Sequence, residues 1–584
     1  MNPMKAEIAK ARRSAASRVF DDSLATAMVT ALTAAVSYWD ELGKRSSGVA
    51  SLPMRQPPAC TNVVDVPAEA LESAREIGRL AAGLDVTEAS FAIGELYTGT
   101  MPKKRRAALG AFYTPPALCE RLLDMATEAG VDWKTARVLD PACGGGAFLA
   151  PVARRMARSM ENIDAAMVIE NVENRLYGIE LDPFAAWLSH IFLDATLYDL
   201  GILTDRGHRA HIQVGDALDL DHQWDEFDLV VGNPPYGRVK LSSQQRCRYR
   251  RSLYGHANLY GLFTDRALRF TRSGGTIALV TPTSFLAGAY FKALRGLLAQ
   301  EAPPIKLEFI AERKGVFADV LQETALAVYR RGDQPGRGEV RFSSVTTDGA
   351  VETTLPRTFG LPENPQSPWL IPRTGDQTSL AHLAVRLKHR LSDYGYEVST
   401  GPLVWNRHRS EIKNSPGKGR FPLIWAESVR AGGVFDFRAQ RRDHQPYFQP
   451  RLGQEWLVTR DPCVLLQRTT AKEQSRRLVA AELPLDFLDK HEGVVVENHL
   501  NVIRPKTAPP RVSPGALAAL LNSRVADQMF RCINGSVAVS AYELEALPLP
   551  PPDNVEGLAE LVRQGSDTRL IEREVAHLYG ETDR

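Results

Sequence analysis

Cysteine is scarce in this sequence, and its scarcity argues against two kinds of structural support. The six cysteines are scattered, form no CxxC pair and have no histidine cluster beside them. We therefore expect neither a disulfide framework nor a structural zinc site, and we assign no metal. Because free cysteines are typical of reducing compartments, the sequence predicts a cytoplasmic location.

Long apolar runs are missing as well. No stretch of about 18 apolar residues occurs, which excludes an ordinary membrane-spanning helix. The N-terminal segment is basic but lacks the apolar core of a signal peptide. The sequence therefore predicts no membrane partner.

A strong overall charge is also absent, since the formal net charge is only +2 over 584 residues. The distribution is more informative. Residues 401–477 hold fifteen Lys and Arg against seven Asp and Glu, a local net charge of +8. Aromatic side chains lie among these charges, and a basic, aromatic-rich region is typical of a surface that binds nucleic acid. These aromatic residues are Trp405, Trp425, Phe435, Phe437, Tyr447, Phe448 and Trp456.

The length predicts several domains, because one ordinary core does not serve so long a chain. Between residues 136 and 331, short β-rich apolar runs alternate with helical stretches. This alternation predicts an α/β fold with a mostly parallel sheet and helices on both faces. The other parts read as helical or as short strands and turns. The predicted division is a helical region at 1–98, the α/β domain at 99–340, a linker at 341–378, an α+β domain at 379–552 and a C-terminal helix at 553–584.

The most specific motif is Asn233-Pro234-Pro235-Tyr236, which directly follows an apolar run. The prolines fix φ and remove two N–H donors, so the Asn233 amide oxygen and the Pro234 carbonyl can face one point. Two such acceptors suit an exocyclic amino group, whose nitrogen would become more pyramidal and aim its lone pair at a methyl donor. Tyr236 offers a flat face on which a base can stack. Taken alone, the motif also fits a strand that ends in a Pro-Pro turn.

A glycine-rich turn follows an earlier strand, in the segment Asp140-Pro141-Ala142-Cys143-Gly144-Gly145-Gly146. Glycines allow the backbone to approach a ligand closely, and the helix that follows favours an anionic group at its N-terminus. The spacing is not GxGxxG and no Walker lysine follows, which weakens the dinucleotide and triphosphate interpretations. A purely structural tight turn is the alternative.

Two further carboxylates end predicted strands. Glu180 follows Tyr177-Gly178-Ile179 and could accept hydrogen bonds from both hydroxyls of a ribose. Asp216 follows the next strand and could accept from an adenine amino group. Each is individually as consistent with a loop cap as with a ligand. Because the carboxyl ends of parallel strands share one edge, we expect Asp140, Glu180, Asp216 and Asn233 to lie together.

A fifth element, Phe112-Tyr113-Thr114-Pro115-Pro116, precedes the first strand of the α/β region. Thr114 as a cap with Pro115 at the first helical position is ordinary chemistry for a helix start. By itself this segment predicts no more than a helix.

Together the five elements resemble the gamma-class N6-adenine DNA methyltransferases of bacterial restriction–modification systems. The order of the elements is the order in that class, and the resemblance covers roughly residues 95–552. It implies a Rossmann-like methyltransferase domain followed by a target-recognition domain. It also implies S-adenosylmethionine as cofactor, held by Phe112, Tyr113, Thr114, Asp140, Pro141, Ala142, Gly144, Glu180, Leu181, Asp216, Ala217 and Asn233.

The resemblance further implies that the target base leaves the duplex and enters a pocket. Asn233 and Pro234 would hold its N6 atom, with Pro235 between them and the stacking Tyr236. A further aromatic side chain packs on the base in that family, and Phe317 stands at the matching place in Gly315-Val316-Phe317.

The expected partner is double-stranded DNA, gripped by the basic region. The resemblance also implies a cognate restriction endonuclease that acts separately, and the asymmetric recognition domain suits a monomer. The candidate DNA-binding residues are Arg407, Arg409, Lys413, Arg438, Arg441, Arg442, Arg468, Lys472, Arg476 and Arg477.

Three alternatives remain open. A combined restriction–methylation enzyme would need a nuclease site, for which Glu411-Ile412-Lys413 with Asp393 upstream is the candidate. A methyltransferase with the same tetrapeptide could act on RNA or on a protein glutamine, although the basic module after the catalytic domain favours DNA. A DNA-binding scaffold with a degenerate methyltransferase fold is the third, against which the intact motifs argue.

Overall fold

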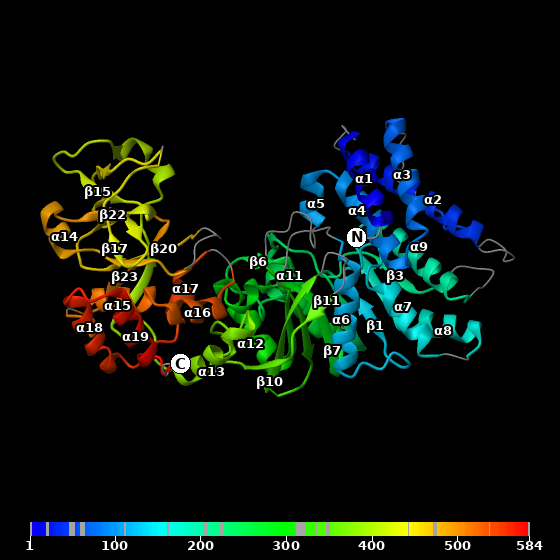
Figure 1. Ribbon diagram of the computed structural model, residues 1–584. Coiled ribbons are helices and arrows are strands. Elements are labelled where there is room, and N and C mark those ends of the chain that lie inside the picture. The colour runs from blue at the N-terminus through cyan, green and yellow to red at the C-terminus, as the bar shows by residue number, and fades with distance from the viewer. Residues whose placement is uncertain are drawn as a thin grey trace. The chain divides into compact units, whose positions relative to one another are not determined.

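The computed structural model separates into two compact units. Unit 1 comprises Met1–Thr283 and Ala293–Pro356, and unit 2 comprises Ser284–Lys292 and Arg357–Arg584. Figure 1 traces both along the chain, from blue at the N-terminus to red at the C-terminus. The structure describes residues 3–18, 23–45, 53–58, 65–109, 113–160, 163–202, 208–220, 226–310, 323–334, 336–345, 351–441, 443–470, 476–507, 509–535 and 538–581.

Unit 1 is built on a mostly parallel sheet, and this confirms the predicted fold class. Its strand order is β11-β10-β8-β9-β7-β4-β1-β2-β3. Strands β7, β4, β1, β2 and β3 are mutually parallel, whereas β9 runs antiparallel to β7 and β8. The strands are β1 (Val138–Asp140), β2 (Leu176–Glu180), β3 (His211–Val214), β4 (Phe227–Gly232), β7 (Thr271–Pro282), β8 (Pro304–Ile310), β9 (Thr324–Arg330), β10 (Arg337–Val345) and β11 (Val351–Thr353).

The sheet extends further along the sequence than expected. The predicted linker begins at residue 341, but β10 pairs with β8 and β11 pairs with β10. In β10 the buried Val340 and Phe342 alternate with the half-buried Arg341, so the strand follows a two-residue period within a polar segment. The proline and glycine residues near this strand are typical of loops, so the sequence pattern did not predict a strand here. The predicted linker at 341–378 therefore contains strand residues, and the division between the units lies within it.

The helices of unit 1 bury one face against the sheet. Helices α6 (Pro116–Glu128) and α7 (Leu149–Arg158) pack Leu122 and Met156 into one hydrophobic cluster with Val138 of β1. Fully burying such side chains contributes about 1.5–3 kcal/mol each. The other helices of this region include α8 (Ala165–Arg175), α9 (Pro183–Asp199), α10 (Ser243–Arg248), α11 (Leu259–Phe270) and α12 (Lys292–Glu301).

The N-terminal helices share their core with α9. Helices α1 (Pro3–Arg18), α2 (Leu24–Arg45), α3 (Ala68–Ala81) and α4 (Val86–Thr100) form one buried cluster with Trp187, Ile191 and Phe192 (Figure 1). Leu193 of the same helix belongs instead to the cluster around the sheet. Helix α9 is therefore buried between two layers, and the predicted division at residue 98 cuts through a continuous core. Helix α5 (Lys103–Leu109) follows α4.

The described part of unit 2 contains two small sheets and a two-stranded antiparallel ribbon of β16 (Val429–Arg430) and β17 (Val434–Phe435). The first, in the order β13-β23-β20-β21, is antiparallel, and the second has the order β14-β18-β15-β22-β19. Their strands are β13 (Tyr396–Thr400), β23 (Leu500–Pro505), β20 (Val464–Gln467), β21 (Ala480–Glu482), β14 (Ile412–Lys413), β18 (Tyr447–Phe448), β15 (Phe421–Ile424), β22 (Val494–Val496) and β19 (Val458–Thr459).

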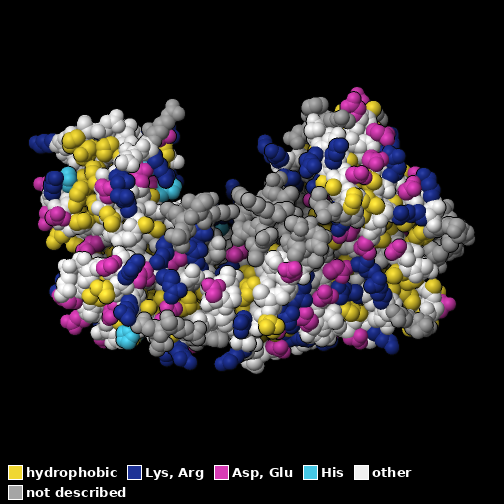
Figure 2. Space-filling view, in the orientation of Figure 1, with side chains coloured by type: hydrophobic (Ala, Val, Ile, Leu, Met, Phe, Trp, Pro, Cys, Tyr) yellow, Lys and Arg dark blue, Asp and Glu magenta, His cyan; other side chains and the backbone are white. Residues whose placement is uncertain are grey.

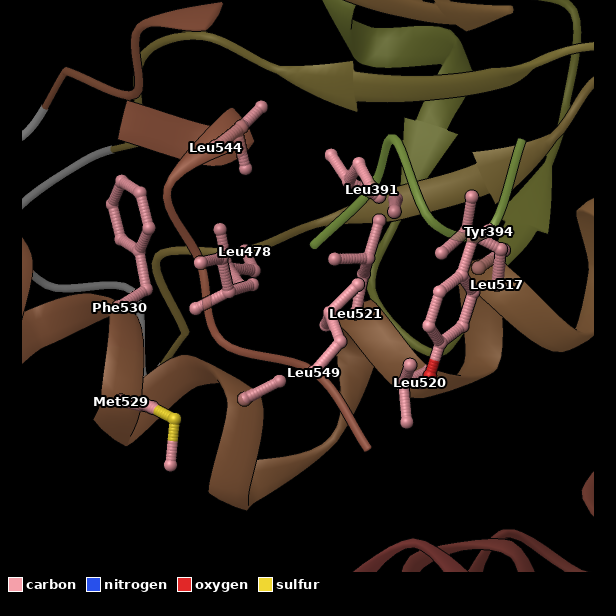
Figure 3. Close-up of a cluster of buried hydrophobic side chains, with 14 of the residues drawn as sticks. Leu391, Tyr394, Leu478, Leu517, Leu520, Leu521, Met529, Phe530, Leu544 and Leu549 are labelled. Carbon is pink, nitrogen blue, oxygen red and sulfur yellow. The ribbon is translucent and has the colours of Figure 1, made fainter. Parts of the chain in front are cut away.

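A helical layer covers the first of these sheets. Helices α15 (Pro514–Asn522), α16 (Arg524–Ile533) and α17 (Ala541–Glu545) supply Leu521, Phe530 and Leu544 to a buried cluster that also contains Leu391 and Tyr394 (Figure 3). The Tyr394 hydroxyl donates to the Pro550 carbonyl, so the polar tip of this side chain is satisfied.

The C-terminal segment corrects another expectation. The sequence predicts one C-terminal helix at 553–584, but two helices form, α18 (Glu556–Arg563) and α19 (Thr568–Leu578). Gly565 between them has φ +63°, and Asp567 starts the second helix by accepting from the Arg569 N–H at 3.1 Å. In the described part of the chain, no helix combines the length and apolarity needed to cross a membrane.

Candidate active site

The polar side chains at the strand ends meet in one pocket of unit 1. Asp140 ends β1, Glu180 ends β2, Asp216 follows β3 by two residues and Asn233 follows β4. Strands β2 and β4 flank β1 on its two sides, so the pocket lies where the strand order reverses. All four side chains line this pocket.

The glycine-rich turn holds Glu180 in a fixed orientation. The Gly144 N–H donates to Glu180 Oε2 at 2.8 Å, and the Asp182 N–H donates to Glu180 Oε1 at 2.8 Å. Gly144 has φ +53° and Gly146 has φ +85°, conformations that glycine adopts without strain. Burial raises the pKa of Glu180, although the backbone donors oppose that shift. Each carboxylate oxygen retains a lone pair for a ligand hydroxyl.

Asp140 is the most deeply buried acid of the pocket, with 1% of its surface exposed. Its Oδ1 accepts from the Ala142 N–H at 3.0 Å. Burial raises the pKa of Asp140 to about 8, and the negative charge of Glu180 adds to the rise. A cationic group entering the pocket would favour the ionised form of this acid.

Asn233 is oriented by hydrogen bonds on both sides of its amide. Its Nδ2 donates to Thr114 Oγ1 at 3.0 Å, and the Tyr236 hydroxyl donates to its Oδ1 at 2.8 Å. Because an amide oxygen has two lone pairs, Oδ1 can accept one more hydrogen bond. The Tyr236 ring stands edge-on to Tyr260, with ring centroids 6.2 Å apart.

Thr114 does not cap the following helix, which corrects the sequence interpretation. Helix α6 begins at Pro116, and Pro115 occupies the cap position with ψ 137° and no side-chain cap. A residue before proline is pushed to extended ψ, so the helix starts one residue later than expected. The Thr114 hydroxyl is thereby left to accept from Asn233.

The structure brings most of the predicted site residues together. The pocket is lined by Tyr113, Thr114, Asp140, Pro141, Ala142, Gly144, Glu180, Leu181, Asp216, Ala217, Asn233 and Pro235. Pro234 and Tyr236 are not among the lining residues, although Tyr236 contacts Asn233. Phe112 and Phe317 lie outside the described residues.

Sequence reasoning missed several lining residues. Tyr97 and Thr98 come from α4, and Leu259 and Phe263 come from α11. All four lie within helical apolar patterns, in which a pocket residue cannot be distinguished from a core residue. No signal in the sequence separates them.

The predicted DNA-binding residues of unit 2 differ in the contacts that they make. Arg407 and Arg409 are exposed, and the Arg409 guanidinium lies 5.1 Å from the Trp405 ring centroid. Others are engaged with acids: Arg438 with Asp436, Arg441 with Glu427 and Arg476 with Glu572. On the visible face in Figure 2, basic side chains are likewise interspersed with acidic ones.

The remaining candidates donate to neighbouring oxygens. Lys413 Nζ donates to the Ser410 carbonyl at 2.8 Å, and Arg468 donates to the Asn498 carbonyl at 2.7 Å. Arg477 donates to Thr470 Oγ1 at 3.3 Å. Arg442 and Lys472 lie outside the described residues.

The candidate nuclease tripeptide is held by structural contacts. Glu411 pairs with Arg451 at 2.6 Å and accepts from Ser410. Asp393 Oδ2 accepts from the Arg390 N–H at 2.7 Å and closes a turn. Both acids thus have local partners that account for their positions.

Comparison with known sequences identifies relatives. Residues 174–317 match the family described as Eco57I restriction-modification methylase. The Type II methyltransferase M.BsuBI of Bacillus subtilis is 25% identical over 472 residues, which cover 79% of this chain and 91% of that protein. The Type II methyltransferase M.PstI of Providencia stuartii is 26% identical over 356 residues, which cover 60% of this chain and 70% of that protein.

Comparison with solved structures agrees in fold. The Type IIL restriction-modification enzyme MmeI, solved in complex with DNA, superposes with a TM-score of 0.54 at 13% identity, over 99% of this chain and 92% of that one. This likeness concerns the fold alone. The sequence relatives confirm the resemblance to restriction–modification methyltransferases that the motifs indicated.

Proposed function

We propose that this chain transfers a methyl group from S-adenosylmethionine to the N6 amino group of an adenine flipped out of double-stranded DNA, as the modification enzyme of a restriction–modification system. One observation supports this above the others. The Asn233 amide lies in the same pocket as Asp140, Glu180 and Asp216, so an amino-group acceptor and a nucleoside site are adjacent.

The residues of the pocket fit the proposed cofactor. Glu180 keeps acceptor capacity on both oxygens for the ribose hydroxyls, and Leu181 beside it is 53% exposed and can cover an adenine ring. Asp216 accepts only the Leu218 N–H among the described residues and can accept from an adenine amino group. The buried Tyr113 hydroxyl has no hydrogen-bond partner in the described structure, as expected of a group that meets a polar ligand.

The chain's contribution to the reaction is to orient the amino group. S-adenosylmethionine supplies an activated methyl group when bound. Asn233 Oδ1 and the Pro234 carbonyl accept the two N–H bonds of the target, and this draws the nitrogen lone pair out of the ring system. Thr114 fixes which end of the Asn233 amide faces the target, because Nδ2 donates to the threonine hydroxyl. Thr114 accepts this hydrogen bond with its neutral hydroxyl group.

Unit 2 supplies the proposed DNA surface. Extruding a base costs a few kcal/mol, which contacts to the duplex must offset. The exposed Arg407 and Arg409 are the strongest candidates for phosphate contacts, and Trp456 of the same unit, which is 69% exposed, adds an aromatic face. We propose a monomer in solution and a separate cognate endonuclease as partner.

Asn233→Ala tests the proposal. The purified variant and the wild-type protein are incubated with double-stranded DNA and labelled S-adenosylmethionine, and the product nucleosides are identified by mass spectrometry. The wild-type protein should form N6-methyladenine, and the variant should be slower by about 100-fold or more. Asn174→Ala, at an exposed position of α8 and outside the pocket lining, is the matched control and should retain activity. A methylated cytosine, or equal rates for Asn233→Ala and wild type, would contradict the assignment.

A further inference from the structure

One wall of the pocket belongs to the N-terminal helices. Tyr97 and Thr98 at the end of α4 line the pocket together with the glycine-rich turn. Helix α4 is anchored to α1 by ion pairs of Lys5 with Glu88 and of Arg12 with Glu95. The pocket wall is therefore continuous with the helical layer that precedes the methyltransferase motifs.

A chain of hydrogen bonds leads from this wall to Glu180. The Tyr97 hydroxyl donates to Asp182 Oδ2 at 2.6 Å. The other carboxylate oxygen of Asp182 accepts from the Phe184 N–H at 3.0 Å, which caps α9. The Asp182 N–H donates to Glu180 Oε1 at 2.8 Å. Tyr97 thus holds the residue whose backbone holds the carboxylate of the ribose site.

The tyrosine is suited to this contact. Tyr97 is 1% exposed and Asp182 is 8% exposed. Water therefore cannot fully replace either side chain as the hydrogen-bond partner of the other. Burial and the adjacent Asp182 carboxylate raise the pKa of Tyr97, which keeps the hydroxyl protonated as a donor. The Tyr97 ring also packs on Phe184, with centroids 4.9 Å apart. Removing the hydroxyl would leave Asp182 Oδ2 buried without its donor.

The same helix contacts the glycine-rich turn. Ser90 Oγ donates to the Gly145 carbonyl at 3.2 Å. The Tyr113 ring lies between Gly94 and Gly145, where an added Cβ would come within 2.1 Å and 2.6 Å of the ring or its hydroxyl. Both halves of the Glu180 cradle, the turn and the Asp182 loop, are therefore braced by α4.

We propose that Tyr97 is a positioning residue of the cofactor site, and that the N-terminal helices form part of that site. It acts through Asp182 on the orientation of Glu180 and hence on the grip of the ribose hydroxyls. This inference rests on the proposed function, because it assumes that the pocket binds S-adenosylmethionine.

A double-mutant cycle tests the inference by binding alone. The affinity for S-adenosylhomocysteine is measured by calorimetry for the full-length wild type, Tyr97→Phe, Glu180→Gln and the double variant. We expect Tyr97→Phe to weaken binding by about tenfold, the effect of one hydrogen bond to a charged group. In the Glu180→Gln background the same substitution should change affinity by less than about twofold, since the group it positions is already altered.

A matched control substitution distinguishes the positioning of Glu180 by Tyr97 from a general effect of removing a buried hydroxyl group. Tyr38→Phe removes a hydroxyl from the same hydrophobic cluster, away from the pocket lining, and should leave affinity unchanged. Equal losses from Tyr97→Phe with and without Glu180→Gln, or no loss at all, would overturn the inference. If the wild type binds no S-adenosylhomocysteine, the proposed function fails together with it. If the wild type binds but methylates no adenine, only the proposed function fails.

A second pair covers the case in which Tyr97→Phe does not fold. Asp182→Asn keeps the helix cap and the backbone donor, and its Nδ2 can donate to the Tyr97 hydroxyl oxygen, so a hydrogen bond between the two side chains remains, whereas Asp182→Ala loses both side-chain hydrogen bonds. We expect the asparagine variant to bind within about twofold of wild type and the alanine variant to bind about tenfold more weakly. Equal affinities of these two variants would overturn the inference.

Discussion

The pocket of unit 1 and the basic surface of unit 2 differ in how their polar side chains are placed. In the pocket, Asp140, Glu180 and Asn233 stand at the ends of neighbouring parallel strands, so the sheet determines their relative positions. On the basic surface, Arg407 and Arg409 lie in short 3₁₀ turns. Topology alone therefore assembles the first group, and local loop conformation decides the second.

The charges differ in the same way. The pocket acids are hydrogen-bonded to backbone N–H groups and keep capacity for a ligand, as Glu180 shows. Several arginines of unit 2 instead pair with acids of their own unit. A net charge counted along the sequence thus overstates the charge available to a partner, because some pairs, such as Arg476 with Glu572, join residues far apart in the sequence.

The largest expected effect is on the pocket. Glu180→Ala removes the two acceptors that we propose for the ribose hydroxyls and should weaken cofactor affinity by about 100-fold or more, since hydrogen bonds to charged groups contribute about 1.5–3 kcal/mol each. Calorimetry with S-adenosylmethionine measures this. Glu226→Ala is the control and should bind normally, because Glu226 lies one residue before the start of β4, at the end of this strand away from the pocket. An unchanged affinity in Glu180→Ala would remove the ribose assignment.

The buried Asp140 of the pocket should make the stability of the protein depend on pH. The pKa of Asp140 is raised to about 8 in the folded protein, so the folded state binds an extra proton between about pH 4 and pH 8. Over this window the raised pKa destabilises the fold progressively as pH rises, by at most about 1.4 kcal/mol per pH unit. Asp140→Asn removes this pH-dependent destabilisation. The stability of the variant relative to wild type should therefore increase from pH 6 to pH 7.5. Denaturant melts at both pH values would show this, and a constant difference would contradict it.

A smaller effect is expected on the basic surface. Arg409→Ala should weaken DNA binding several-fold and lower the slope of log affinity against log salt by about one. Arg438→Ala should have less effect, because Arg438 is already paired with Asp436. Fluorescence anisotropy over a salt series compares the two variants. Equal losses would mean that the acid pairs open when DNA binds.

The smallest effect separates structure from binding within unit 2. Arg476→Ala breaks a half-buried pair with Glu572 and should lower stability by about 0.5–1 kcal/mol, with DNA affinity unchanged. A thermal melt and an anisotropy titration of the same sample decide between the roles. A loss of DNA affinity without a loss of stability would return Arg476 to the binding surface.

The sequence was sufficient for features that depend on strand order. The alternation of short apolar runs with helical stretches predicted the mostly parallel sheet, and the pocket gathers the four polar residues expected at its strand ends. The sequence was insufficient where a residue has two roles, or where a strand lies in a polar segment. Tyr97 occupies a buried position of a helix and lines a pocket as well, and β10 alternates within a polar segment. The single C-terminal helix was wrong because the break at Gly565 depends on its left-handed backbone conformation.

The burial of α9 between two layers has a consequence for synthesis on the ribosome. Helices α1 to α4 leave the ribosome before α9, and the side chains that complete their core, such as Trp187 and Phe192, follow some ninety residues after α4. Until then their apolar faces have no partner, and such a state is prone to aggregation. We therefore expect the isolated N-terminal fragment to depend on chaperones, and a fragment that extends through α9 to be markedly more soluble.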